Sequence, residues 1–398
     1  PDGQRPAMLY AGNRALAGSI RTALSKIASE LVICPNVRPA LEVEDLGPAQ
    51  RELAKLAINI RQRQIPELEE LRALSGGVIL PSAYAQGRMV RFLSVDGENK
   101  YVLSVDAGAS AVSLAAAFGE DLRLNIFPHF GLGEPLAGLL KHTTLDEIAR
   151  WLPLEIPVET VRDYLYQKSL YPQFIPAIRD ELFIEQAIAR QNLLLSTNTM
   201  AQRLPGRYRR QAGLLPSFDL ILAGGAVLTN APSLGQKLLL LLDGLQPVGI
   251  TTLVLDQNNL LAMLGAAVEI NSLLPVQVMD AGALAYLATV ISPVSDAAFG
   301  TPIVRAKLIR EDGTAMISEV NMGNLQILPL DSGQNARLEL RPLRNADVGL
   351  GPGRPGAVDV VGSSLGVVID ARGRPLRLPS NPSDRVKLLK KWLKTVGG

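Results

Sequence analysis

Short apolar runs alternate with helical periodicity along most of this chain. Runs at residues 7–11 and 31–34 predict strands, the second of them buried, and the spacing of apolar positions over 14–29 and 49–63 predicts helices. Strands that alternate with helices are typical of a layered α/β fold with parallel strands in its middle. The first hundred residues are therefore expected to form one α/β lobe.

The pattern changes at residue 101. Runs at 101–106, 112–118 and 122–127 predict three consecutive strands that are separated by short turns of small and polar residues. Residues 135–215 are mainly helical in pattern and are broken by prolines, and strand–helix alternation returns from 218 to about 280. We expect a second α/β lobe with a helical insertion.

Short strands with glycine and proline turns fill residues 295–380 and predict a β-rich appendage, either a sandwich or a small barrel. Within it, 358–361 and 366–370 are expected to pair as a hairpin. The last segment, 381–398, predicts a basic amphipathic helix that begins after Asn381. Such a helix can lie on an anionic membrane or on a partner, but docking on its own domain is the expected arrangement.

Composition narrows the classes of function. The chain has 398 residues, of which 47% are apolar and 20% are charged, with a net charge of +2. These values fit a globular protein with a sizeable core and no overall field that would attract nucleic acid. A single cysteine, Cys34, and two histidines exclude an internal disulfide and argue against a multi-histidine metal site. Together with the absence of a long uncharged apolar run, they predict a cytoplasmic protein.

Three segments carry candidate chemistry, and the first is the strand and turn over 103–110. It delivers Asp106 into a turn of small residues with Gly108 and Ser110. Such a turn lets backbone N–H groups approach a phosphate, and the carboxylate can hold Mg²⁺ through water. The same pattern also describes an ordinary hairpin turn.

The second segment is the Gly131–Pro135 stretch, in which Gly133 and Glu134 precede an apolar helix. Glycines at a helix start favour anions, although Glu134 also fits as a plain first-turn acid. The third is the strand at 218–223 that ends in Gly224 and Gly225, where a flat ring or a phosphate can lie against the backbone. A second strand, turn and helix follow it, with Gly265 on a small-residue helix face.

The order of these segments resembles the superfamily of actin, hexokinase and the heat-shock chaperones. The resemblance implies that Asp106 and Gly108 belong to the second phosphate loop, with Asp106 towards Mg²⁺. It also places Gly133 and Glu134 on the phosphate side, and Gly224 with Gly225 under the adenosine of ATP.

A closer resemblance is to the glutamate mutase accessory family, a bacterial group called MutL. It rests on Ala11-Gly12-Asn13-Arg14, on Pro35-Asn36-Val37 with Pro39, and on Val105–Ala109. It implies an actin-like, ribonuclease H-like bilobed core that lacks its first phosphate hairpin. In that scheme 1–100 is a remnant of the first lobe, 101–294 is the second lobe with its insertion at 135–215, and the β-rich appendage and the terminal helix follow.

Two functions remain open at this stage. The first is an ATP-binding accessory protein that assembles or reactivates a partner enzyme, which the resemblance implies to be a cobalamin-dependent mutase. The second is a non-catalytic scaffold or filament subunit that contacts copies of itself. The second is favoured by the absence of an Asp-x-Gly-x-Thr hairpin and by Ser110 as the lone hydroxyl of its loop. Any ATPase activity would rest on an incomplete set of phosphate-binding motifs. A small-molecule kinase is a weaker third reading, because no acceptor constellation is recognisable.

Overall fold

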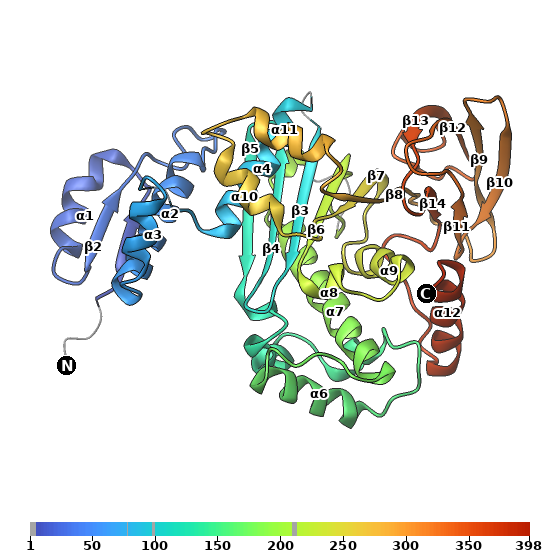
Figure 1. Ribbon diagram of the computed structural model, residues 1–398, viewed down its shortest axis with the longest axis horizontal. Coiled ribbons are helices and arrows are strands. Elements are labelled where there is room, and N and C mark those ends of the chain that lie inside the picture. The colour runs from blue at the N-terminus through green and yellow to red at the C-terminus, as the bar shows by residue number, and fades with distance from the viewer. Residues whose placement is uncertain (1–4, 78, 98–99, 209–212) are drawn as a thin grey trace. The chain divides into compact units, whose positions relative to one another are not determined.

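The computed structural model describes residues 5–77, 79–97, 100–208 and 213–398. The chain divides into two compact units, shown in Figure 1. The first unit comprises Pro1–Met89 with Leu261–Ser272, and the second comprises Val90–Leu260 with Leu273–Gly398. Each unit is described below by itself. The predicted domain limits remain a prediction, and residues 209–212 of the predicted insertion lie outside the described part of the chain.

The first unit holds a two-stranded parallel sheet, in which β1 (Ala7–Tyr10) pairs with β2 (Glu30–Ile33). Helix α1 (Ala17–Leu24) connects the strands, and the longer helices α2 (Gly47–Gln64) and α3 (Leu68–Leu74) follow. The apolar runs predicted as strands thus form strands, although β2 is half-buried and not buried as predicted. Cys34 directly after β2 is a buried free thiol.

Two helices that join the units pack closely within the first one. These are α4 (Ser82–Asp96) and α10 (Leu260–Ala267). A Cβ atom built on Gly265 would lie only 1.8 Å from the carbonyl oxygen of Ala85. The small helix face expected from the sequence therefore serves close backbone packing at Gly265.

The second unit is built around an eight-stranded mixed sheet with the order β11-β14-β8-β7-β6-β3-β4-β5. Its strands are β3 (Tyr101–Ala107), β4 (Val112–Phe118), β5 (Asp121–Phe127), β6 (Leu220–Gly224), β7 (Gly249–Leu255), β8 (Ala285–Ser292), β11 (Leu325–Leu328) and β14 (Val367–Asp370). The three predicted strands are confirmed as an antiparallel meander, β3 to β5. Strands β3, β6 and β7 run parallel in the middle of the sheet.

Helices pack against this sheet and bury its core. The helices are η3 (Glu134–Lys141), α5 (Leu145–Ala149), α6 (Val158–Leu170), α7 (Arg179–Arg203), α8 (Ala226–Thr229) and α9 (Leu234–Gly244). A further helix, α11 (Leu273–Asp280), has only Pro275 buried. Helix α7 packs against β4 and α9, and the consecutive leucines of α9, Leu238 to Leu242, are all buried. A helix that is apolar on every side is expected only in the interior.

A separate antiparallel sheet has the order β10-β9-β12-β13. Its strands are β9 (Pro302–Arg310), β10 (Ala315–Asn321), β12 (Asn335–Pro342) and β13 (Gly356–Val361). The predicted hairpin of 358–361 with 366–370 is wrong, because β13 pairs with β12 while β14 pairs with β8 and β11 in the large sheet. All four residues of β14 are buried, as befits a strand covered on both faces, whereas exposure alternates along β13.

The C-terminal helix α12 (Pro382–Thr395) docks on its own unit. Its cap is the predicted one, since the Asn381 side chain accepts hydrogen bonds from the N–H groups of Ser383 and Asp384. Its apolar face is buried, and the Nε1 of Trp392 donates to the carbonyl oxygen of Gly323 at 3.0 Å. The expected docking is thereby confirmed.

A buried ion network joins α7, α9 and the segment after β14. Asp370 accepts from Arg372 Nε at 2.8 Å and from Arg374 Nη2 at 2.6 Å. Asp243 accepts from Arg372 Nη1 and from Arg190 Nε, both at 2.8 Å. We call these five residues the buried ion network. Burial raises the pKa of Asp370, but the opposite effect of Arg372 and Arg374 is larger. The pKa of Asp370 therefore lies well below the usual carboxyl range.

Within the described ranges, no helix combines the length and apolar character that are needed to cross a lipid bilayer. The fold is mixed α/β, with one large mixed sheet and one separate antiparallel sheet.

Candidate functional site

The candidate site lies where the three parallel strands of the large sheet end. Strands β3, β6 and β7 are neighbours, so their carboxyl ends meet at one edge, where open α/β sheets commonly bind ligands. Asp106 is in register with Gly224, and Asp256 directly follows β7, its N–H donating to the carbonyl oxygen of Ala223 at 2.8 Å. Two carboxylates and a glycine thus share this edge.

Gly224 lies between the two carboxylates. A Cβ atom built on it would be 3.9 Å from Asp106 Oδ1 and 4.0 Å from Asp256 Cβ. Asp256 is only 3% exposed, and its Oδ1 accepts a hydrogen bond from the N–H of Leu260 at 2.8 Å. Any larger residue at position 224 would fill the space that separates the acids.

The electrostatics of this pair favour a cation. Burial raises the pKa of Asp106, and the negative charge of Asp256 raises it further. A divalent cation near the oxygens of Asp106 would lower the cost of ionising that group. Among the described residues, no group of three or more His, Cys, Asp or Glu side chains could hold a metal ion.

The first two sequence motifs pack directly against each other. The N–H of Gly108 donates to the carbonyl oxygen of Ala111 at 3.0 Å, which closes the turn after β3. The N–H of Gly133 then donates to the carbonyl oxygen of Ala109 at 2.9 Å. A Cβ atom on Gly131 would lie 2.4 Å from that same carbonyl oxygen. The second glycine segment is thereby held against the turn, whose exposed tip is Ala109 and Ser110.

Gly225 brings the third motif onto the first. Its φ is +98°, a left-handed conformation that only glycine adopts readily. A Cβ atom there would also lie 2.4 Å from the carbonyl oxygen of Ala107 in β3. The turn from β6 into α8 therefore requires glycine twice over, once for its conformation and once for this close approach.

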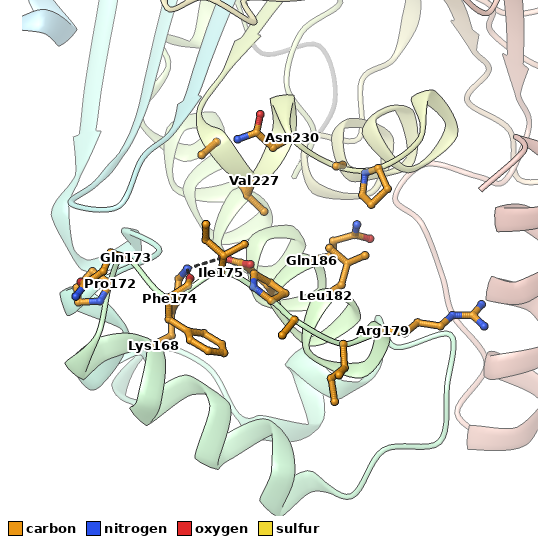
Figure 2. Close-up of a pocket in the computed structure, with 17 residues that line it drawn as sticks. Lys168, Pro172, Gln173, Phe174, Ile175, Arg179, Leu182, Gln186, Val227 and Asn230 are labelled. Atoms are coloured by element: carbon orange, nitrogen blue, oxygen red, sulfur yellow. Dashed lines mark hydrogen bonds and ion pairs between the residues drawn. The ribbon is translucent and has the colours of Figure 1, made fainter.

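A pocket of about 640 Å³ adjoins these motifs. Figure 2 shows its walls, which include Val227 from α8, Asn230 directly after that helix, and Leu182 and Gln186 from α7. The segment that joins α6 to α7 forms the remaining wall and includes Pro172. The lining is largely apolar and carries a few polar side chains, which is typical of small-molecule sites.

The pocket is connected to both glycine segments. Helix α8, which follows Gly225 directly, supplies part of its wall. A Cβ atom on Gly133 would lie 3.0 Å from Pro172 Cβ. Inside the pocket wall, Lys168 Nζ pairs with Glu185 Oε1 at 2.9 Å, and both side chains are largely buried.

Most residues expected from the sequence lie together. Register, hydrogen bonds and close approaches join the turn after β3, the second glycine segment and the end of β6, which contain Asp106, Gly108, Ser110, Gly133, Gly224 and Gly225. Glu134 is exposed and lines a different pocket of about 390 Å³ with His129, Lys141 and His142. The structure thus places the Glu134 side chain on a different surface from the pocket that adjoins Gly133.

Asp256 is the residue that sequence reasoning missed. The sequence predicted only a turn at 256–259, although a carboxylate directly after a buried strand is the same signal that drew attention to Asp106. The sequence does not show that Asp256 lies near Asp106, because this depends on β7 being the neighbour of β6 in the sheet.

The sequence of the chain was compared with curated proteins and with models of protein families. No curated protein matches the chain. A family model described as MutL protein matches residues 3–282, which are well over half of the chain. The chain belongs to this MutL family, the accessory family of glutamate mutase.

Proposed function

We propose that this chain is an ATP-binding accessory protein with an actin-like core that assembles or reactivates a mutase. Family membership supports an accessory role for a mutase. The nucleotide part of the proposal rests on one observation. Asp106 and Asp256 flank Gly224 at the carboxyl edge of the sheet, and helix α8, which follows Gly225, lines a pocket of about 640 Å³.

Different residues would bind the cation, the phosphates and the adenosine of the ligand. Asp106 and Asp256 would hold Mg²⁺, which supplies positive charge against the phosphates. The turn at Gly108 and Ser110 would lie beside the phosphates, because its small residues let the chain approach closely. The adenosine would enter the pocket beyond Gly225, where the apolar Val227 offers contact with a ring.

The polar groups of the pocket suit a purine base. Gln186 and Asn230 carry amide groups that can both donate and accept hydrogen bonds. The pocket volume of about 640 Å³ falls within the range of roughly 300–1,000 Å³ that is usual for such ligands. We assign no hydrolytic base, and the proposal is for binding.

Calorimetric titration with Mg-ATP tests the proposal. We expect saturable binding by the parent chain and a loss of at least tenfold in affinity for Asp106→Asn, because one ligand of the cation is removed. Val227→Trp should also weaken binding, since the larger ring fills the pocket. Asp163→Asn and Ile126→Trp are matched controls, because both parent side chains are exposed and lie outside the pocket. Failure of the parent chain to bind Mg-ATP would overturn the proposal.

A scaffold is the second candidate, and one observation favours it. The N–H groups of Gly108 and Gly133 donate to carbonyl oxygens of the chain itself and are not free to bind a phosphate. Sedimentation at increasing protein concentration without nucleotide tests this candidate. Growing assemblies would support a scaffold, whereas a constant monomer would exclude self-assembly as its function.

A further inference from the structure

A second cavity, of about 350 Å³, opens in the second unit. It lies between the C-terminal half of α7, the residues that follow α9, and Pro375 and Leu376, which follow Arg374 of the buried ion network. Its polar lining residues are Arg150, Thr197, Asn198, Gln202 and Gln246. None of them belongs to the candidate nucleotide site. We call this cavity the arginine cavity.

The wall of the arginine cavity contains buried polar atoms without partners. Thr197 is only 4% exposed, and among the described residues its Oγ1 has no hydrogen-bond partner. The Nε of Arg150 is likewise buried and unbonded within the described part of the chain. Buried polar groups are nearly always hydrogen-bonded in folded proteins, so both atoms call for a polar ligand or ordered water.

Arg150 is the charged residue in the described lining of the arginine cavity. Arg150 Nη1 pairs with Glu147 at 2.9 Å, and its guanidinium lies 4.8 Å from the ring centre of Trp151. Burial lowers the pKa of Arg150, Glu147 raises it, and the nearby charge of Arg385 from α12 lowers it again. Arg385 Nε is also buried without a partner among the described residues. Arg385 does not line the cavity, but its charge acts on Arg150, whose guanidinium is paired with one carboxylate.

We propose that the arginine cavity binds a small organic anion, with its carboxylate or phosphate group against Arg150 and the Thr197 hydroxyl. Planar guanidinium groups are well matched to both kinds of oxyanion. Asn198 and Gln202 would bind the remaining polar groups of the ligand, and Leu194 and Leu245 would cover its carbon atoms. The volume equals that of about a dozen water molecules and therefore suits a small metabolite.

Calorimetric titration of the full chain with three probes tests this site. The probes are succinate, inorganic phosphate and succinamide, the uncharged diamide of succinate. We expect saturable binding of at least one anion and none of succinamide. Binding of succinate alone identifies a carboxylate site, and binding of phosphate alone identifies a phosphate site. The proposal fails if neither anion binds, or if succinamide binds as well as succinate.

Variants distinguish the arginine cavity from adventitious surface binding. Arg150→Gln should weaken anion binding at least tenfold, and Arg385→Gln should weaken it severalfold. Arg162→Gln is the matched control, because this exposed arginine of α6 lies outside the cavity lining. Equal affinity in all three variants would show adventitious binding only and would overturn the proposal.

Thr197→Val provides a second readout that does not depend on the arginines. Removing an unpartnered buried hydroxyl should raise the melting temperature of the ligand-free chain, while anion affinity falls severalfold. Titration of this variant with Mg-ATP should match that of the parent, which separates this site from the proposed nucleotide site. A lower melting temperature with unchanged anion affinity would show that the hydroxyl stabilises the fold and does not bind the anion.

Discussion

Two aspartates of the second unit, Asp370 and Asp106, have opposite surroundings. Asp370 is fully buried and bonded to Arg372 and Arg374, which hold its pKa far below the usual range against the effect of burial. Asp106 is half-buried beside Asp256, and both burial and that neighbour raise its pKa. Asp370 is paired with arginines of the same chain, whereas Asp106 has a second carboxylate as its neighbour.

This difference separates acids that hold the fold together from acids kept for a ligand. Ionised side chains are rarely buried unless they are paired, and the buried ion network satisfies that rule with three arginines. Asp106 follows the opposite pattern, because burial and the charge of Asp256 both raise its pKa. Such perturbed groups gather at functional sites.

The largest effect is expected from breaking the buried ion network. Asp370→Asn leaves the charges of Arg372 and Arg374 buried with one carboxylate fewer, and it should lower the free energy of unfolding by about 3–5 kcal/mol at pH 7. Urea unfolding at pH 7 measures this loss.

The pH dependence of the same variant provides its check. The pKa of Asp370 is lowered in the folded state, so its contribution is present above the ordinary carboxyl pKa and disappears as the pH falls through the folded value. The gap between parent and variant should therefore narrow in strong acid. A loss below 1 kcal/mol at pH 7 would contradict the assigned role of the network.

Removal of one acid from the proposed nucleotide site should have the opposite sign. Asp106→Asn should raise the free energy of unfolding of the ligand-free chain at pH 7 by about 0.5–2 kcal/mol, because the variant avoids both the burial of a charge and the repulsion from Asp256. The raised pKa of Asp106 means that its favourable contribution exists at low pH and is lost as the pH rises through the folded value. The two proteins should therefore converge in acid, and a destabilised variant at pH 7 would refute this assignment.

The smallest effect is expected at an exposed ion pair of the antiparallel sheet. Lys307 Nζ lies 3.6 Å from Glu339 Oε2, and both side chains are more than two-fifths exposed. Lys307→Gln should change the free energy of unfolding by less than about 0.5 kcal/mol, since water and salt screen such pairs. If Lys307→Gln lowered the free energy of unfolding as much as Asp370→Asn, burial would not explain why the two ion pairs differ in strength.

Much of the second unit could be predicted from the sequence. The strands at 101–106, 112–118 and 122–127 carry continuous apolar runs that are bounded by turns, and glycines marked the turns that need close approach or positive φ. These are local signals, because each depends on residues that are adjacent in the chain. The helical cap at Asn381 was predictable for the same reason.

Pairing between distant segments could not be predicted. Asp243 and Arg372 form a buried ion pair although they lie far apart in the sequence. In the same way, β14 follows β13 in the chain but enters the large sheet beside β8. The role of Asp256 depends on the strand order, so its turn-like sequence carried no sign of the partner across the sheet.

Thermal unfolding of the parent and Asp106→Asn, each with and without Mg-ATP, tests the central claim most directly. Without ligand we expect the variant to melt at the higher temperature, because it lacks the repulsion between the two acids. With Mg-ATP the order should reverse, since only the parent keeps both carboxylates for the cation and is stabilised by binding. If Mg-ATP shifts both proteins equally, or shifts neither, the Asp106–Asp256 pair is not a nucleotide–metal site.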